Sequence, residues 1–186
     1  HTTSVSHAAA IKVAESLAHI DNPRIVVVGA GEMAKICVRA LIHHDITNIC
    51  IMNRTHERSK ALADEFGVSS HEWHRLWDEL KSADAVMTAT GAPHTILHHP
   101  DIEHVMQTRH QRDFLLVDVA VPRDIESTVS ELQGATVYDI DDLQMVIDGH
   151  LAQRQACIPQ VHSIIESELE KCTTWLAGRK VVPVIR

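Results

Sequence analysis

The segment richest in potential chemistry is a glycine turn that directly follows a run of β-branched residues. Residues 25–28 read Ile-Val-Val-Val, and Gly29, Gly31 and Ala34 follow at the spacing G-x-G-x-x-A. The first glycine of such a turn permits the bend, and the second lets the backbone approach a phosphate closely. A helix that begins here directs its free N–H groups and its positive end at an anion. The spacing therefore predicts a binding site for the pyrophosphate of a dinucleotide.

Two arginines follow the next predicted strand, where a dinucleotide fold meets the adenosine ribose. This strand ends in Asn53, Arg54 and Thr55, and Arg58 lies one helical turn beyond Arg54. An acidic residue here hydrogen-bonds a free 2′-hydroxyl, whereas a guanidinium matches the geometry of a 2′-phosphate. No carboxylate stands at the strand end, so NADPH is predicted in preference to NADH. The alternative is a pair of solvated arginines, although positive charge at a helix start opposes the helix dipole.

Histidine is frequent, with 15 residues in the chain. The short clusters are His43 with His44, His98 with His99, and His71 with His74. No Cys or carboxylate completes a tetrahedral set at ligand spacing, so no metal site is predicted and surface histidines are the simpler interpretation.

Composition limits the class of protein. The 186 residues suffice for one α/β domain and an appendage, and a formal charge of −8 gives no general attraction to nucleic acid or to anionic membranes. No apolar run reaches the roughly 18 residues of a spanning helix, and no signal peptide opens the chain. Four cysteines without C-x-x-C spacing are expected to be buried thiols, so we expect a cytoplasmic protein.

Strand and helix patterns alternate with short connections. Helices are expected over residues 4–18, 32–44, 56–66, 73–80 and 101–108, and strands over 25–28, 48–52, 84–89, 113–119 and 136–138. This alternation predicts an α/β fold, a Rossmann-type doubly wound parallel sheet with flanking helices. After Asp139, apolar residues recur three, four or seven apart over more than 30 residues and predict a long C-terminal helix, either a strut or half of a dimer seam. Pro159 is expected to kink or interrupt it near Gln155.

Five motifs in order resemble those of glutamyl-tRNA reductase. They are the glycine turn of residues 29–34, Asn-Arg-Thr at 53–55, TGAPH at 90–94, DVAVPRD at 118–124 and YDIDDL at 138–143. The resemblance spans essentially the whole chain. It implies a leading helix over residues 1–20, an NADP-binding Rossmann domain over 21–140, and over 141–186 a connecting helix with the start of a missing dimerisation domain.

The resemblance also implies an activity. Members of this family use NADPH to reduce glutamyl-tRNA(Glu) through a cysteine thioester to glutamate-1-semialdehyde, which opens the biosynthesis of 5-aminolevulinate, heme and other tetrapyrroles. A homodimer and glutamate-1-semialdehyde aminomutase as a partner are implied for the full-length protein, with the tRNA bound mainly through the missing domains. The implied cofactor contacts are Gly29, Ala30, Gly31, Glu32, Met33, Ala34, Asn53, Arg54, Thr55, Arg58, Thr90 and Gly91.

The family's nucleophile lies in a Thr/Ser-Cys-Asn-Arg motif, which does not occur here. We therefore expect no catalytic residue in this chain, and expect Cys50 to be buried in the sheet. Asp118 either borders the site or caps the following turn. Arg123 is expected to pair with Asp124 or Asp141.

Two other functions remain open at this point. A shikimate-dehydrogenase-like NADP-dependent reductase also carries a glycine turn followed by Asn-Arg-Thr, but leaves the segment of residues 120–124 and the long helix unexplained. A non-catalytic interaction module that responds to NADPH is the other alternative.

Overall fold

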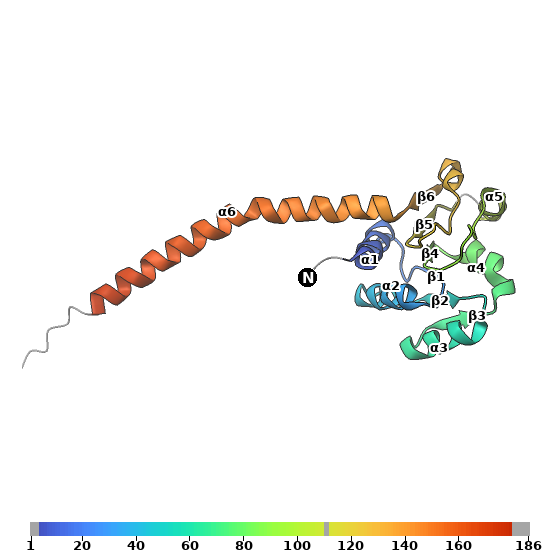
Figure 1. The fold of residues 1–186 in the computed structure, drawn as a ribbon, viewed down its shortest axis with the longest axis horizontal. Helices are drawn as coiled ribbons and strands as arrows, with labels where there is room; N and C mark the ends of the chain where they lie inside the picture. The colour runs from blue at the N-terminus through green and yellow to red at the C-terminus, as the bar shows by residue number, and fades with distance from the viewer. Residues whose placement is uncertain (1–3, 110–111, 180–186) are drawn as a thin grey trace, which may run out of the picture. The chain divides into compact units, whose positions relative to one another are not determined.

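A computed structural model describes residues 4–109 and 112–179 of the chain (Figure 1). These residues fall into two compact units, His1–Ile147 and Asp148–Arg186. The first unit contains the sheet and every residue of the predicted site. Among the described residues, no helix combines the length and the apolar character needed to cross a membrane.

The first unit is built on a parallel sheet. Within the described residues its six strands are β1 (Ile25–Val28), β2 (Ile49–Met52), β3 (Ser69–His71), β4 (Ala85–Thr88), β5 (Phe114–Asp118) and β6 (Ala135–Tyr138). Their order is β3-β2-β1-β4-β5-β6. The chain thus winds outward from β1 in one direction and from β4 in the other, which is the doubly wound Rossmann topology that the sequence predicts.

Helices cover both faces of this sheet. They are α1 (Val5–Ser16), α2 (Glu32–His43), α3 (His56–Phe66), α4 (Leu76–Ser82) and α5 (His99–Thr108), with short 3₁₀ turns η1 (Trp73–Arg75) and η2 (Ser127–Glu131). Alternate residues of the central strands point to opposite faces, so Val27 packs in the core beneath α1, α2 and α3. Val26 packs instead in the core beneath α4 and α5.

Two parts of this unit differ from the sequence-based prediction. Strand β3 was not predicted, because its Ser-Ser-His sequence has no apolar pattern and it lies at the edge of the sheet beside β2. The helix expected over residues 73–80 is divided into the 3₁₀ turn η1 and the α-helix α4. Thr55 occupies the N-cap position of α3 as predicted, but its side chain makes no capping hydrogen bond.

The long C-terminal helix is α6, which runs from Ile140 to Arg179. Its first turns belong to the first unit, where Leu143 and Ile147 are buried in the core. Of the two outcomes predicted at Pro159, a kink or an interruption, the interruption does not occur, because the helix continues on both sides of it. A proline in a long helix removes one backbone hydrogen bond, which the bonds of the neighbouring turns outweigh. The side chains of residues 149–164 lie outside the described part.

Candidate functional site

The three predicted cofactor-contact segments meet where the central strands of the sheet have their carboxyl ends. They follow β2, β1 and β4, which are adjacent strands, and Val28 at the end of β1 is paired with Met52 and with Thr88. Because the strands are parallel, their carboxyl ends lie together. The strand order reverses between β1 and β4, and open α/β sheets bind ligands in the crevice at such a switch point.

The glycine turn has the geometry that a pyrophosphate needs. Gly29 has φ +124°, and a Cβ on it would lie 2.4 Å from the carbonyl oxygen of Ala89, so only glycine fits. Gly31 is the N-cap of α2, and a Cβ there would meet nothing within 4 Å. Ala34 is buried against the sheet. The turn therefore presents an open backbone surface at a helix N-terminus, which fits the pyrophosphate of a dinucleotide.

Two hollows are lined by the predicted contact segments. The first, of about 380 Å³, is lined in part by Asn53, Arg54, Thr55, Arg58, Thr90 and Gly91. The second, of about 300 Å³, is lined in part by Ala30, Gly31, Glu32 and Arg58. Arg58 therefore borders both. Met33 lies outside these linings and accepts a hydrogen bond at Sδ from the Ser6 hydroxyl, with 2.8 Å between the atoms.

The first hollow is electropositive. The side chains of Arg54 and Arg58 are exposed at it, and no Asp or Glu is among the residues that line it. The guanidinium carbon of Arg54 lies 5.9 Å from the ring centre of Trp73, which also lines the hollow. The sequence analysis interpreted Trp73 only as a helix residue; the available signal was a tryptophan in the polar stretch that follows α3.

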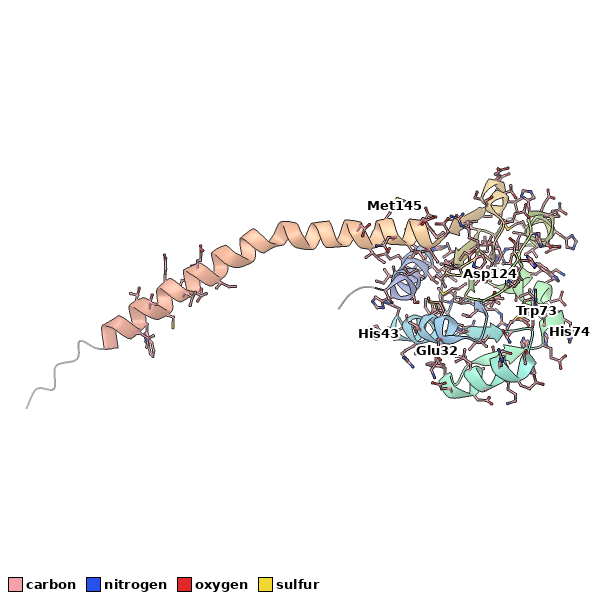
Figure 2. All side chains as sticks on the ribbon, in the orientation of Figure 1. Glu32, His43, Trp73, His74, Asp124 and Met145 are labelled. Carbon is pink, nitrogen blue, oxygen red and sulfur yellow. The ribbon has the colours of Figure 1, made fainter. Side chains whose placement is uncertain are left out.

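Asp124 holds the loop after β4 in place, a role that sequence reasoning missed. The backbone N–H and the hydroxyl of Thr90 donate to its two carboxylate oxygens, with distances of 3.0 and 2.6 Å. Asp124 is fully buried, and burial raises the pKa of its carboxyl. Trp73 and Asp124 are both labelled in Figure 2. The contact fixes Thr90 and Gly91 at the crevice, although Asp124 itself is not among the residues that line the first hollow.

The structure decides the roles of Asp118 and Arg123. Asp118 accepts hydrogen bonds from the backbone N–H groups of Ala120, Asp124 and Ile125 over 2.8–3.0 Å, so it caps the turn that follows β5. Arg123 pairs with Asp141, as one of the two predictions stated, with 3.2 Å between the atoms, and it also pairs with Asp139.

The fold agrees with that of known proteins that resemble the chain. A family model described as shikimate / quinate 5-dehydrogenase matches residues 12–146. The chain belongs to this family.

Glutamyl-tRNA reductases are among the proteins similar to the chain, which confirms the resemblance found from the motifs. The enzyme of Desulfatibacillum aliphaticivorans is 36% identical over 185 residues, which are 100% of this chain and 43% of that protein. The structure of glutamyl-tRNA reductase from Methanopyrus kandleri superposes with a TM-score of 0.84 at 33% identity, covering 96% of this chain and 45% of that one. The chain corresponds to the NAD(P)-binding domain region of these enzymes, and spans less than half the length of the curated relatives it matches.

A second similar structure shares the fold. The nucleotide-binding domain of glutamyl-tRNA reductase from Thermoplasma volcanium has a TM-score of 0.63 at 16% identity, over 82% of this chain and 96% of that one. The Rossmann unit is thus common to these proteins.

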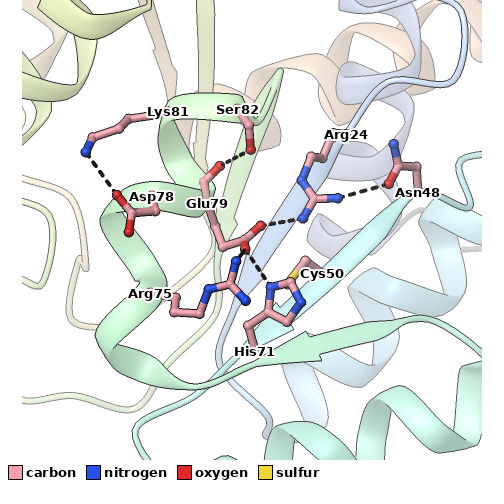
Figure 3. A network of polar contacts seen from close by, with 9 residues as sticks. All are labelled: Arg24, Asn48, Cys50, His71, Arg75, Asp78, Glu79, Lys81 and Ser82. Atoms are coloured by element: carbon pink, nitrogen blue, oxygen red, sulfur yellow. Dashed lines mark hydrogen bonds and ion pairs between the residues drawn. The ribbon is translucent and has the colours of Figure 1, made fainter.

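A second cluster of reactive side chains lies away from the crevice (Figure 3). Cys50 Sγ is 3.7 Å from His71 Nδ1, which is 2.6 Å from Glu79 Oε1. These are metal-ligating residue types, but Arg24 and Arg75 already pair with the Glu79 carboxylate, so a cation would have to displace two guanidiniums. Cys50 is buried in the sheet as predicted, and burial raises its pKa. We interpret the cluster as structural.

Proposed function

We propose that the chain is the NADPH-binding domain of a glutamyl-tRNA reductase, which reduces glutamyl-tRNA(Glu) through a cysteine thioester to glutamate-1-semialdehyde in tetrapyrrole biosynthesis. The similarity to glutamyl-tRNA reductases over the whole chain supports this family assignment. The observation that carries the cofactor assignment is the pair Arg54 and Arg58 at a hollow whose lining contains no carboxylate. Paired guanidiniums stabilise a 2′-phosphate and give little to a 2′-hydroxyl.

The proposed contacts follow from the positions of the segments. The backbone of residues 29–34 and the N-terminus of α2 hold the pyrophosphate, because the open face at Gly31 lets it approach. Arg54 and Arg58 hold the 2′-phosphate, with Asn53 and Thr55 beside the adenosine.

Thr90 and Gly91, held by Asp124, border the nicotinamide side of the crevice in this proposal. When bound, the cofactor supplies a hydride, which a thioester carbonyl accepts far more readily than a carboxylate does. Homodimerisation, binding of the tRNA and contact with the aminomutase belong, in this proposal, to the full-length protein.

The cofactor assignment is tested by titrating the chain with NADPH and with NADH, following the fluorescence of the reduced nicotinamide. We expect tighter binding of NADPH. Arg54→Ala should weaken NADPH binding about 10- to 100-fold, since a charge-assisted hydrogen bond contributes about 1.5–3 kcal/mol, and should leave NADH binding almost unchanged. Arg39→Ala is the matched control, because Arg39 is exposed on α2 and lies outside the linings of both hollows. Equal affinities for the two cofactors in the unaltered chain would refute the phosphate assignment.

A further inference from the structure

The guanidinium of Arg54 lies over the ring of Trp73 at the first hollow. The guanidinium carbon is 5.9 Å from the ring centre, and both residues line the hollow. An arginine within about 6 Å of an aromatic ring centre is attracted to the face of the ring, and tryptophan gives the strongest attraction. Trp73 opens the turn η1, whereas Arg54 follows β2, so the contact exists only because the fold brings these two segments together.

The two side chains differ in their freedom to move. Trp73 is half-buried and packs against the core beneath α4 and α5, which fixes its ring. Arg54 is exposed, and its side chain makes no ion pair or hydrogen bond with another of the described residues. Holding an exposed arginine in one rotamer costs side-chain entropy when a ligand binds. A fixed ring that already restricts Arg54 reduces this cost, because the guanidinium is in place before the ligand arrives.

The contact with the ring leaves the donors of Arg54 available. The five N–H donors of a guanidinium lie in its plane, whereas its attraction to an aromatic ring acts through its face. A guanidinium over a ring can therefore direct an N–H edge at a phosphate. Arg58 lines the same hollow, but among the described residues no aromatic ring lies over its guanidinium, so the ring acts on Arg54.

We propose that Trp73 is a positioning residue for the 2′-phosphate of the cofactor: it holds the guanidinium of Arg54 at the first hollow and so strengthens the preference for NADPH over NADH. This inference rests on the proposed function, because it gives Trp73 a part in recognising that cofactor. The ring acts through Arg54 and needs no contact with the phosphate. A stacking surface for the adenine would act differently, since both cofactors carry that base and would depend on Trp73 equally.

The test is a calorimetric titration of the unaltered chain and of Trp73→Leu with NADPH and with NADH. We expect about a two- to fivefold loss of NADPH affinity, the size of an exposed cation–π contact, and unchanged NADH affinity. Trp73→Phe keeps a ring with a weaker attraction, so its NADPH affinity should lie between those two. Trp77→Leu is the matched control, because Trp77 packs against the same core but does not line the first hollow. It should bind both cofactors as the unaltered chain does.

Two measurements keep the result interpretable. Urea unfolding shows which variants fold, and Trp73→Met provides a second variant without a ring, whose flexible side chain can fill the space beside the core. A double-mutant cycle then shows whether the ring acts through Arg54. In a chain that already carries Arg54→Ala, Trp73→Leu should cause no further loss of NADPH affinity.

The outcomes separate this inference from the proposed function. Unchanged NADPH affinity in the ring-free variants, or an equal loss of affinity for NADPH and NADH, would overturn the role of Trp73 alone. Additive losses from Trp73→Leu and Arg54→Ala would overturn it as well, because the ring would then act independently of the guanidinium. Equal affinities for the two cofactors in the unaltered chain would instead overturn the phosphate assignment on which the inference rests.

Discussion

Gly29 and Gly31 are two residues apart but face different surroundings. A methyl group at Gly29 would strike the backbone of Ala89 and would require a φ of +124°, whereas one at Gly31 would enter open space. Gly29→Ala should therefore lower the free energy of unfolding by about 3 kcal/mol or more. Gly31→Ala should leave stability within about 1 kcal/mol and weaken cofactor binding, because its methyl group would lie where the pyrophosphate is proposed to bind.

Urea unfolding and cofactor titration of both variants separate the two roles. Gly67→Ala is a useful comparison: this glycine has φ +68° but open space around it, so the variant reports backbone strain without a clash. If Gly31→Ala bound NADPH as tightly as the unaltered chain, the proposed phosphate contact at this turn would be wrong.

At the residue scale, the sequence predicted the parts of the site that are continuous in the chain. The glycine turn and the Asn53–Thr55 segment are recognisable because strand, turn and helix follow one another locally. Trp73 and Asp124 were missed because their roles depend on packing. Asp124 reaches Thr90 across 34 residues of chain, and no local periodicity reports such a contact.

At the scale of elements, the carboxylate of Glu79 links helix α4 to strand β3 and to the segment before β1 (Figure 3). From α4 it accepts a hydrogen bond from His71 at the end of β3 and pairs with Arg24, which precedes β1. Burial acts to raise the pKa of Glu79, but the hydrogen bonds from Arg24 and His71 outweigh it and hold the pKa below its ordinary value of 4.5. The charged carboxylate is thus stabilised by folding. This contribution is present above the unfolded pKa and is lost as the pH falls through the lower, folded pKa.

Glu79→Gln should lower the free energy of unfolding at pH 7 by about 2–4 kcal/mol, because it leaves Arg24 without its buried partner. The loss should shrink as the pH falls through the lowered folded pKa of Glu79, because the unaltered carboxyl is then itself protonated. Chemical unfolding over a series of pH values measures both effects. Glu72→Gln is the control, since Glu72 pairs with His74 on the surface and should matter by less than about 0.5 kcal/mol. A loss that stays the same down to the lowest pH at which the unaltered chain remains folded would exclude a role for the charge.

Elements with strong apolar patterns were predicted well, and the edge of the sheet was not. Residues 25–28 and 49–52 are buried on both faces and read as continuous apolar runs. Strand β3 pairs only with β2, through backbone hydrogen bonds. Backbone hydrogen bonds do not depend on the type of side chain, so the polar sequence of β3 does not indicate a strand.

At the scale of the whole molecule, we expect the chain by itself to bind NADPH without turnover on glutamyl-tRNA. A thioester pathway requires a thiolate, but burial raises the pKa of Cys37 to about 11 and raises that of Cys50 as well. Incubation with glutamyl-tRNA and excess NADPH, assayed for glutamate-1-semialdehyde, should give no product. Cys172 is exposed, so Cys172→Ser serves as a control and should change nothing. Formation of semialdehyde would show that a nucleophile within these residues was overlooked.

A different assay distinguishes the second candidate function. The family model named for shikimate / quinate 5-dehydrogenase is the observation that favours a shikimate-dehydrogenase-like reductase. If the full-length protein oxidised shikimate with NADP⁺, the result would favour the shikimate-dehydrogenase-like function over the glutamyl-tRNA reductase function.

The pattern of residues was sufficient to predict the doubly wound fold, the glycine turn and the positions of the two arginines. These features follow from burial patterns and chain geometry over a few residues, where each side chain's surroundings depend on its immediate neighbours. Only the tertiary structure decided the Asp124–Thr90 contact, the Glu79 network and the contact of Trp73 with Arg54. Their members are separated in the chain and are brought together by the packing of helices on the sheet and on one another, which the local pattern of residues does not encode.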